Sequence, residues 1–467
     1  MGSEYILGRG VQPPLAMRAA WLPQLGAAGY RQLLAAMYCP ATLRAAGLPA
    51  AAVQAIAGFV ACHGLERLPR REWQLESDSK SPIYVVDTRL PGMPAYRLVC
   101  KWYLGSRQRL AAVEQRMNAY FCQHLPPHGR VGPILAVVTP AATTPVSVAL
   151  MPYLAGPTLY ERLQHLPRHD PQVVSLLRQA LRTLARVQVL GRYGHESGDL
   201  ELVTFSQPEA RTYLLAQLER ALLPPFAAGD TALPAALLPN AAWLAELLAA
   251  DGAHAGLYYR GSNPRNIILV DDIQVEIDFE QETLRSRWLD AVTLLENGLE
   301  LAHWDATADY PACGAAVPSA AWRRRHRRAW AALAAHNYLS HAQGGRLLRD
   351  FLAVSQRWQR RYLPALPCDS DAQRQRLLLE ATRVFRHLQY VGYCKRNELQ
   401  ALTPDKRRSS RHRQHYHLLW AKCALDRLLL SPPACLPPAG REAATALRRT
   451  LDALTQVLQA APLLAET

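Results

Sequence analysis

Two oxygen-bearing side chains, Asn266 and Asp278, stand twelve residues apart at the two ends of one predicted hairpin. Asn266 directly precedes the apolar run IILV, and Asp278 directly follows the run VEI, with a polar Asp-Asp pair between the two runs. A polar turn between β-branched strands predicts a hairpin, which brings both side chains to the same end. Amide and carboxylate oxygens at one point can hold a hard cation such as Mg²⁺ against phosphates. The alternative is a loop between two strands that carries no chemistry.

The segment that precedes this hairpin alternates strands with one helix. Strands are predicted at 82–88 and 96–103, a helix at 106–125, and two further strands at 133–139 and 146–154. The turn signal LPGMP separates the first two strands. Strand, strand, helix, strand, strand predicts an α+β lobe on an antiparallel sheet.

The rest of the chain is predicted to be mainly helical. Residues 1 to about 70 and most of the chain after Gly156 have apolar residues at helical spacing. The Pro- and Ala-rich stretch 222–240 is predicted to be an insertion or surface loop. A break at 431–438 precedes a last amphipathic helix, which carries Leu447, Leu451, Leu454 and Leu458.

The order of these pieces resembles the protein-kinase-like superfamily and, within it, the aminoglycoside phosphotransferase and choline kinase group. The resemblance covers residues 73 to about 300. It implies a two-lobed α+β fold with an N-terminal helical extension (1–70), a kinase-like N-lobe (71–155) and an enlarged helical C-lobe (156–467). The catalytic-loop hairpin of that C-lobe falls at 258–280.

The resemblance implies a nucleotide site on the N-lobe. Lys101, in the strand LVCKWY, matches the lysine that contacts phosphate, and Glu114 in the following helix matches its partner. An unpaired buried ammonium is costly, so a partner is expected; a surface lysine whose stem lies along the strand is the plainer alternative. The segment 148–163 resembles the hinge that holds an adenine ring, which makes Met151 and Tyr153 candidate ATP-binding residues.

The resemblance extends to the loop and hairpin that hold the metal. The group has the pattern H-G-D-x-x-x-x-N, a hairpin, and I-D-[FW]-[DE], and SNPRNIILV followed by VEIDFE fits its second half. Asn266 and Asp278 fall on the two metal ligands. Asp290 matches the Asp that braces the catalytic loop, and Gln188 stands where a helix of the group usually has His.

The first half of that pattern is altered. Gly261 falls on the catalytic Asp, and Tyr259 falls on the His. In the group the Asp accepts the proton of the attacking hydroxyl and orients it. Glycine can do neither, and such groups typically contribute ~10²–10⁴-fold in rate. The residues are those expected of a pseudokinase that still binds nucleotide.

The phosphate loop is altered as well. Where kinases keep a glycine-rich turn, this chain has ESDSKSPIYVV. Ser79 and Ser81 can still contact phosphate, whereas Pro82 removes a backbone donor and Asp78 repels a triphosphate.

Composition indicates a folded protein with acidic partners. The formal charge is +15, the sequence pI is near 9.6, and hydrophobic residues make up 49%. The nine cysteines are scattered without C-x-x-C spacing, which favours a reducing compartment. No signal peptide or membrane span is evident, so a cytoplasmic location is expected.

Two arginine-rich runs, 323–328 and 406–413, are candidate contacts for nucleic acid or an acidic protein. The alternative is a solvated helix face at 323–328 and a basic loop that leads into a helix at 406–417. The histidines 412, 415 and 417 are expected to be solvated, because no regular carboxylate or cysteine accompanies them.

These observations predict a protein that binds ATP with Mg²⁺ and transfers phosphate to a small-molecule or acidic acceptor. A catalytically inactive pseudokinase used as a binding or scaffold module is an equal alternative. Nucleotidyl transfer on the same fold and an RNA-binding helical protein are two further alternatives.

Overall fold

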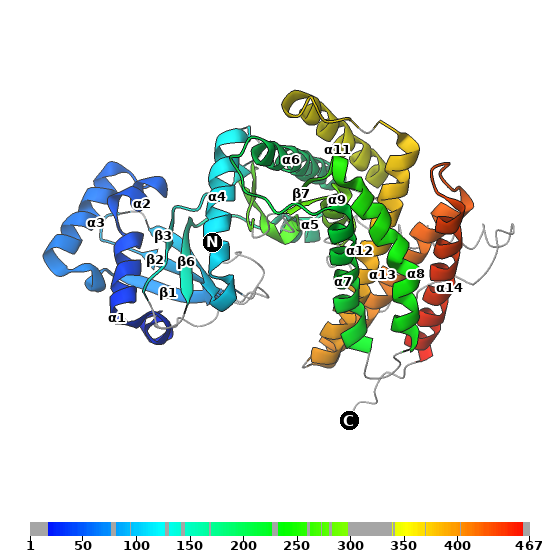
Figure 1. Cartoon of the computed structure of the whole chain (residues 1–467). Helices are drawn as coiled ribbons and strands as arrows, with labels where there is room; N and C mark the ends of the chain where they lie inside the picture. Colours follow the sequence, from blue (N-terminus) through cyan, green and yellow to red (C-terminus); the bar gives the residue numbers. More distant parts are fainter. Residues whose placement is uncertain are drawn as a thin grey trace.

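The computed structural model describes residues 17–75, 81–93, 95–126, 130–141, 145–167, 170–226, 232–258, 262–271, 273–279, 283–297, 339, 341–368, 370–401 and 403–460. The described part forms two lobes (Figure 1). The N-lobe comprises elements α1 to β6 and contains the large sheet; the C-lobe comprises α5 to α14 and is mainly helical. The α+β, two-lobed fold class predicted from the sequence is confirmed.

The N-lobe is organised around a five-stranded antiparallel sheet. Its order is β1 (Arg70–Leu75), β2 (Ile83–Thr88), β3 (Tyr96–Leu104), β6 (Val146–Pro152) and β5 (Ala136–Val138). Strand β1 was not predicted, because its sequence RREWQL alternates charged and apolar residues only briefly. The register sets Val85 opposite Val99, and Val99 opposite Met151.

Side chains of alternate parity point to the two faces of this sheet. Leu98, Cys100 and Trp102 of β3 are buried against the N-terminal helices, in one apolar cluster. These helices are α1 (Met17–Met37), α2 (Pro40–Ala45) and α3 (Ala50–His63), which lie on the outer side of the sheet in Figure 1. The opposite face carries Lys101 and is called the Lys101 face below; helix α4 (Arg109–His124) packs there.

The C-lobe helices enclose the largest apolar cluster. They are α5 (Leu159–Gln164), α6 (Pro171–Glu196), α7 (Gln207–Phe226), α8 (Ala232–Ala249), α9 (Trp288–Val292), α11 (His341–Tyr362), α12 (Ala372–Gln400), α13 (Pro404–Leu430) and α14 (Pro438–Ala460). Short 3₁₀ turns occupy Leu65–Arg67, Gly105–Arg107, Ala250–His254 and Pro264–Asn266. Among the described residues, no helix is long and apolar enough to cross a membrane.

Two loop predictions for the C-lobe were wrong. The stretch 222–240 is mostly helical, since α7 continues to Phe226 and α8 runs from Ala232 through Pro239. Ala and Leu favour helix, and Leu222 and Leu237 pack into the core, which outweighs the prolines. The basic run that starts at 406 also belongs to a helix, the first turns of α13. The predicted break at 431–438 is confirmed, because it separates α13 from α14.

The predicted hairpin is confirmed as β8 (Ile267–Val270) and β9 (Ile273–Glu276). Asp271 in its turn has φ 47°, a left-handed conformation that Asp tolerates. Strand β4 (Arg130–Val131), from the segment after α4, pairs in parallel with β9 and so joins the hairpin to the N-lobe. A separate pair is formed by β7 (Gly256–Tyr258) and β10 (Thr283–Arg285).

Helix α9 continues into a single π-helical turn, Thr293–Asn297, which is held by side chains of α12. The Arg386 guanidinium donates to the Thr293 hydroxyl over 2.9 Å. Glu296 accepts from Arg383 at 2.8 Å, and its other oxygen lies 3.2 Å from His387 Nε2. Such turns need outside partners because they break the regular helical hydrogen bonds. Here α12 provides these partners and thereby positions α9.

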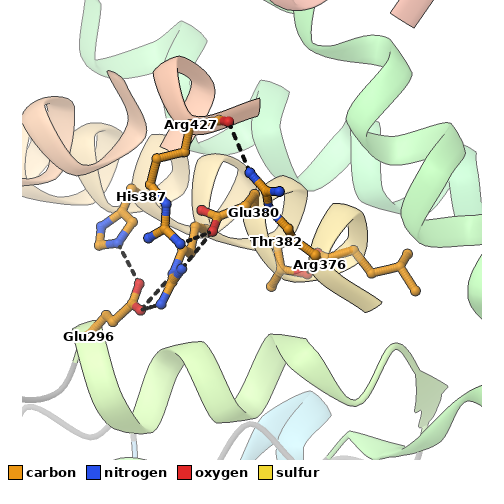
Figure 2. Close-up of polar contacts among 8 residues, drawn as sticks. Glu296, Arg376, Glu380, Thr382, His387 and Arg427 are labelled. Atoms are coloured by element: carbon orange, nitrogen blue, oxygen red, sulfur yellow. Dashed lines mark hydrogen bonds and ion pairs between the residues drawn. The ribbon is translucent and has the colours of Figure 1, made fainter. Parts of the chain in front are cut away.

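The contacts extend from Glu296 across α12 to α13 as one buried polar network (Figure 2). Arg383 also donates to Glu380 over 2.9 Å, and Glu380 pairs with Arg427 of α13 at 2.7 Å. Burial alone would raise the pKa of Glu296, but the Arg383 charge and the His387 hydrogen bond bring that pKa below its usual value. The network therefore favours the ionised carboxylate, which charge-assisted bonds hold in a dry setting.

We expect Glu296→Gln to lower the free energy of unfolding by about 2–4 kcal/mol at pH 7, since it leaves a buried guanidinium with less counter-charge. Because the folded-state pKa of Glu296 is lowered, its contribution is present above the unfolded pKa of about 4.3 and is lost as the pH falls through the folded value. Denaturant titrations at pH 7 and pH 4 should show the largest difference from the natural chain at pH 7. Glu246→Gln, at an exposed position of α8, is the matched control; an equal effect of both substitutions would contradict the prediction.

Candidate active site

Lys101 stands at the centre of the candidate site and contacts two carboxylates. Its Nζ donates to Glu114 Oε2 of α4 over 2.9 Å and to Asp278 Oδ1 over 2.6 Å. The Lys101 side chain is buried, whereas that of Asp278 is 36% exposed. Strand β3 thus places an ammonium between a carboxylate of the N-lobe and one of the C-lobe. The structure brings together Lys101, Glu114 and Asp278, three of the residues that the sequence suggested for this site.

Glu114 is fully enclosed and fixes the position of the lysine. The Tyr103 hydroxyl, two residues along β3, also donates to Glu114 Oε2. Burial raises the pKa of Glu114; the Lys101 ammonium opposes this shift, and the nearby Asp278 adds to it. A buried carboxylate that accepts from an ammonium and a phenol is strongly oriented. Lys101 therefore has a defined direction before any ligand arrives.

Asp278 and Asn266 meet at one end of the hairpin, as the sequence predicted. Asn266 Nδ2 donates to Asp278 Oδ2 over 3.2 Å, and the Ile277 amide donates to the Asn266 carbonyl over 2.9 Å. Asp278 has φ 77°, an uncommon left-handed conformation. Such strain typically costs about 1–3 kcal/mol and is found at functional sites. The next residue, Phe279, is fully buried, and its ring lies 5.3 Å from that of Phe121 of α4, which anchors the strained turn.

These side chains suit a hard cation that also contacts phosphate. The Asn266 amide and the Asp278 carboxylate supply oxygen ligands, and the Lys101 ammonium adds a point charge for phosphate oxygens. Among the described residues there is no group of three His, Cys, Asp or Glu side chains that could hold a metal. A metal here would take its other ligands from water and phosphate, which is how Mg²⁺ commonly binds.

The segment that the sequence matched to a catalytic loop is described from Ser262 onward. The Ser262 hydroxyl donates to the Asp290 carbonyl of α9 over 3.3 Å, and Asn263 Oδ1 accepts from the Arg265 amide over 3.0 Å. Asp290 is fully buried behind the loop. Gly261, which the sequence suggested as the position of a missing base, lies outside the described residues, as does Tyr259.

The two serines proposed for phosphate contact have different outcomes. Ser79 lies outside the described residues. Ser81 is fully buried two residues before β2 and does not present its hydroxyl at the surface. The Pro82 carbonyl accepts from the Trp102 amide of β3, which holds this segment against the sheet.

An apolar surface lies beside Lys101 on the same face of the sheet. The register sets Trp73, Val85, Val99 and Met151 in a row across four strands. Trp73 and Val85 are buried and pack with Val99 and Tyr153. A flat, apolar group such as a nucleotide base suits the part of this face that is partly exposed, at Val99, Met151 and Tyr153. Sequence reasoning missed Trp73, Val85 and Val99, although the two-residue period from Lys101 could have indicated Val99.

The segment after β6 connects this surface to the hairpin. A Cβ atom at Gly156 would lie 1.8 Å from the Leu269 carbonyl oxygen, so only glycine fits. The Leu269 amide donates to the Pro157 carbonyl over 2.9 Å, and Thr158 forms a bridge with Ile268. Met151 and Tyr153 therefore lie on a segment that is fixed to the same hairpin as Asn266.

His417 and Gln188, two positions named from the sequence, both lie in the interior of the C-lobe. His417 is fully buried rather than solvated, and its Nδ1 lies 2.9 Å from His387 Nδ1, because this face of α13 packs on α12. Gln188 donates to the Arg287 carbonyl over 3.1 Å and is buried.

Of the arginine-rich runs, 323–328 lies outside the described residues. In the run 406–413, Arg411 pairs with Glu398 of α12 at 2.9 Å. Part of the positive charge of this second run is therefore neutralised within the chain.

No protein-family model matches this chain, and no curated protein sequence is significantly similar to it. Among solved structures, a choline kinase from Cryptosporidium parvum is similar over 80% of this chain and 96% of that chain, with 12% identity and a TM-score of 0.46. A choline/ethanolamine kinase family protein from Mesorhizobium loti is similar over 85% and 98%, with 15% identity and a TM-score of 0.40. A glucosamine kinase in complex with glucosamine, ADP and inorganic phosphate is similar over 78% and 91%, with 13% identity and a TM-score of 0.38.

Likenesses at these identities say nothing about chemistry. The chain's own geometry is more specific: a five-stranded antiparallel sheet, a helix that pairs with a mid-strand lysine, and a hairpin whose Asp meets that lysine. By this arrangement the chain has a two-lobed, protein-kinase-like fold.

Proposed function

We propose that the chain binds ATP with Mg²⁺ at the Lys101–Asp278 site and acts as a phosphotransferase toward a small-molecule acceptor. The observation that carries the proposal is the contact of Lys101 Nζ with Asp278 Oδ1 at 2.6 Å, while Asn266 holds the other oxygen of that carboxylate. One ammonium and two oxygen-bearing side chains converge on one point beside an apolar surface. This is the set of groups that a nucleoside triphosphate with a divalent cation requires.

Each residue has a distinct part in this proposal. Lys101 contacts phosphate oxygens and is held in place by Glu114. Asn266 and Asp278 hold the cation, which when bound supplies positive charge against the phosphates. The partly exposed side chains of Val99 and Met151 receive the base. Because catalysis of phosphoryl transfer is mostly positioning and electrostatics, the fixed direction of Lys101 matters more than its basicity.

A second function shares the nucleotide site but lacks turnover. Gly261 stands where a carboxylate would accept the acceptor's proton, and glycine offers no side chain for that step. The chain would then be a nucleotide-binding module that presents its surface to another molecule. The two functions predict the same ATP binding and differ only in whether phosphate is transferred.

The first test is calorimetric titration with ATP, with and without Mg²⁺. We expect Mg²⁺-dependent binding that Asp278→Ala weakens at least about tenfold, since one of two protein ligands is lost. Asp350→Ala, which removes a carboxylate paired with Arg182 on the C-lobe surface, should bind as the natural chain does. Absence of binding at millimolar ATP would refute both functions.

The second test restores the missing base. If Gly261 is the only defect, Gly261→Asp should raise ATP turnover by about 10²–10⁴-fold and leave ATP affinity within about twofold. Gly261→Asn, which has the same shape and no base, should gain nothing. Label transferred from γ-labelled ATP identifies phosphoryl transfer, whereas label from α-labelled ATP identifies nucleotidyl transfer. Equal turnover of both variants and the natural chain would mean that Gly261 is not the limiting position.

A further inference from the structure

A second cluster of charge lies on the N-lobe, at the end of the sheet away from the Lys101 contacts. The register sets Arg71 of β1 opposite Asp87 of β2, and Asp87 opposite Arg97 of β3. Arg89 follows β2 directly, and its amide donates to the Pro69 carbonyl before β1. Antiparallel pairing therefore gathers residues that are far apart in the sequence at one corner of the sheet.

These residues line an open pocket of about 340 Å³, whose walls are Pro69, Arg70, Arg71, Asp87 and Arg89. The volume is within the range of small-ligand sites, roughly 300–1,000 Å³. Arg97 lies four residues before Lys101 on β3, which corresponds to about 13 Å along the strand. The pocket is thus separate from the proposed phosphate end of the nucleotide site.

Arg70 and Asp87 are structural members of this pocket. Arg70 donates to Glu72 over 2.7 Å and to the Tyr30 hydroxyl of α1 over 2.8 Å, so its charge is matched and its donors are used. Asp87 is buried and accepts from Arg89 at 3.0 Å, with Arg97 at 3.5 Å. One carboxylate therefore faces two guanidinium groups and cannot neutralise both.

Arg71 adds a third guanidinium with no carboxylate partner in the described part of the chain. It is exposed, and its Cζ lies 5.4 Å from the Trp73 ring, which limits its freedom without neutralising it. Arg89 is also accessible, with 67% of its side chain exposed. Arg71, Arg89 and Arg97 carry three positive charges and Asp87 neutralises one, so this corner of the sheet retains two unmatched positive charges.

The geometry points to an anion-binding site in this pocket that takes a phosphate-bearing small molecule. Arg71 and Arg89 contact the anion, because their planar N–H groups suit phosphate oxygens. Asp87 positions Arg89 and Arg97 and does not contact the ligand. The excess of two charges matches a phosphate dianion, and the pocket volume admits a small molecule rather than a polymer.

The site is physically linked to the segment after β6. Arg97, which shares Asp87 with Arg89, also lies over the Tyr153 ring at 5.3 Å. An anion that draws Arg89 away from Asp87 strengthens the remaining Asp87–Arg97 pair. Anion binding in the pocket is therefore expected to change the contact between Arg97 and the Tyr153 ring, beside the apolar surface.

The test is calorimetric titration of the full chain with inorganic pyrophosphate in the presence of EDTA. Binding of one anion per chain, weaker at higher salt, is expected. The double variant Arg71→Gln/Arg89→Gln should weaken it at least about tenfold. Arg349→Gln/Arg441→Gln, which removes two exposed arginines of α11 and α14, should leave it within about twofold. The same affinity in both double variants would overturn the proposal.

Asp278→Ala separates this proposal from the proposed function. That variant should lose Mg²⁺-dependent ATP binding but retain pyrophosphate binding in the pocket. Because Asp278→Ala would not release an anion held by the Lys101 ammonium in EDTA, Lys101→Met locates the anion: loss of pyrophosphate binding in Lys101→Met would place the anion at the Lys101 site and overturn the proposal. If the glutamine variant does not fold, as judged by thermal unfolding, Arg71→Lys/Arg89→Lys keeps the charge and removes the planar donors. This variant should still weaken binding at least about threefold, and full affinity would again contradict the proposal.

Discussion

The buried ammonium of Lys101 is the constraint on which the rest of the site depends. An ammonium enclosed in a sheet costs free energy unless carboxylates accept from it. Glu114 comes from α4 and Asp278 from the hairpin, so satisfying one charge fixes the sheet, a helix and the hairpin together. The left-handed backbone at Asp278 is tolerated because the buried Phe279 ring holds the turn in place. The residues proposed to bind phosphate and metal are thus the residues that join the two lobes.

The C-lobe also contains a buried cation between two carboxylates, in this case the guanidinium of Arg383. Arg383 lies between Glu296 and Glu380, and this network holds the π-helical turn at the end of α9. Helix α9 also carries Asp290, whose carbonyl accepts from Ser262 in the loop that precedes the hairpin. The loop on one side and α12 on the other are therefore connected through a single short helix. Removal of a charge from this network is therefore expected to shift α9 and, with it, the loop that contacts Asp290.

The positive charge of the chain is partly neutralised by internal ion pairs and partly left unmatched at one corner of the sheet. Many arginines are matched inside the protein, as with Arg383 and with Arg448, which pairs with Asp426 at 2.6 Å. At the corner of the sheet that carries Arg71 and Arg89, the charge exceeds what Asp87 can neutralise. Net charge alone predicted acidic partners without locating them. Strand register identifies the place, because it brings three arginines, Arg70, Arg71 and Arg89, from the ends of two strands to one pocket.

The sequence by itself determined the order of elements and the local geometry of the hairpin. Periodicity indicated the helices and most strands, and the spacing of Asn266 and Asp278 predicted their meeting, because a hairpin is a local structure. The sequence could not show the strand β1 with Trp73, the helical state of 222–240, or the burial of His417. Each of these depends on partners distant in the chain, which outweigh local propensity. The tertiary structure alone decided which side chains share a face with Lys101, because strand register is set by contacts between strands and not by the residues of one strand.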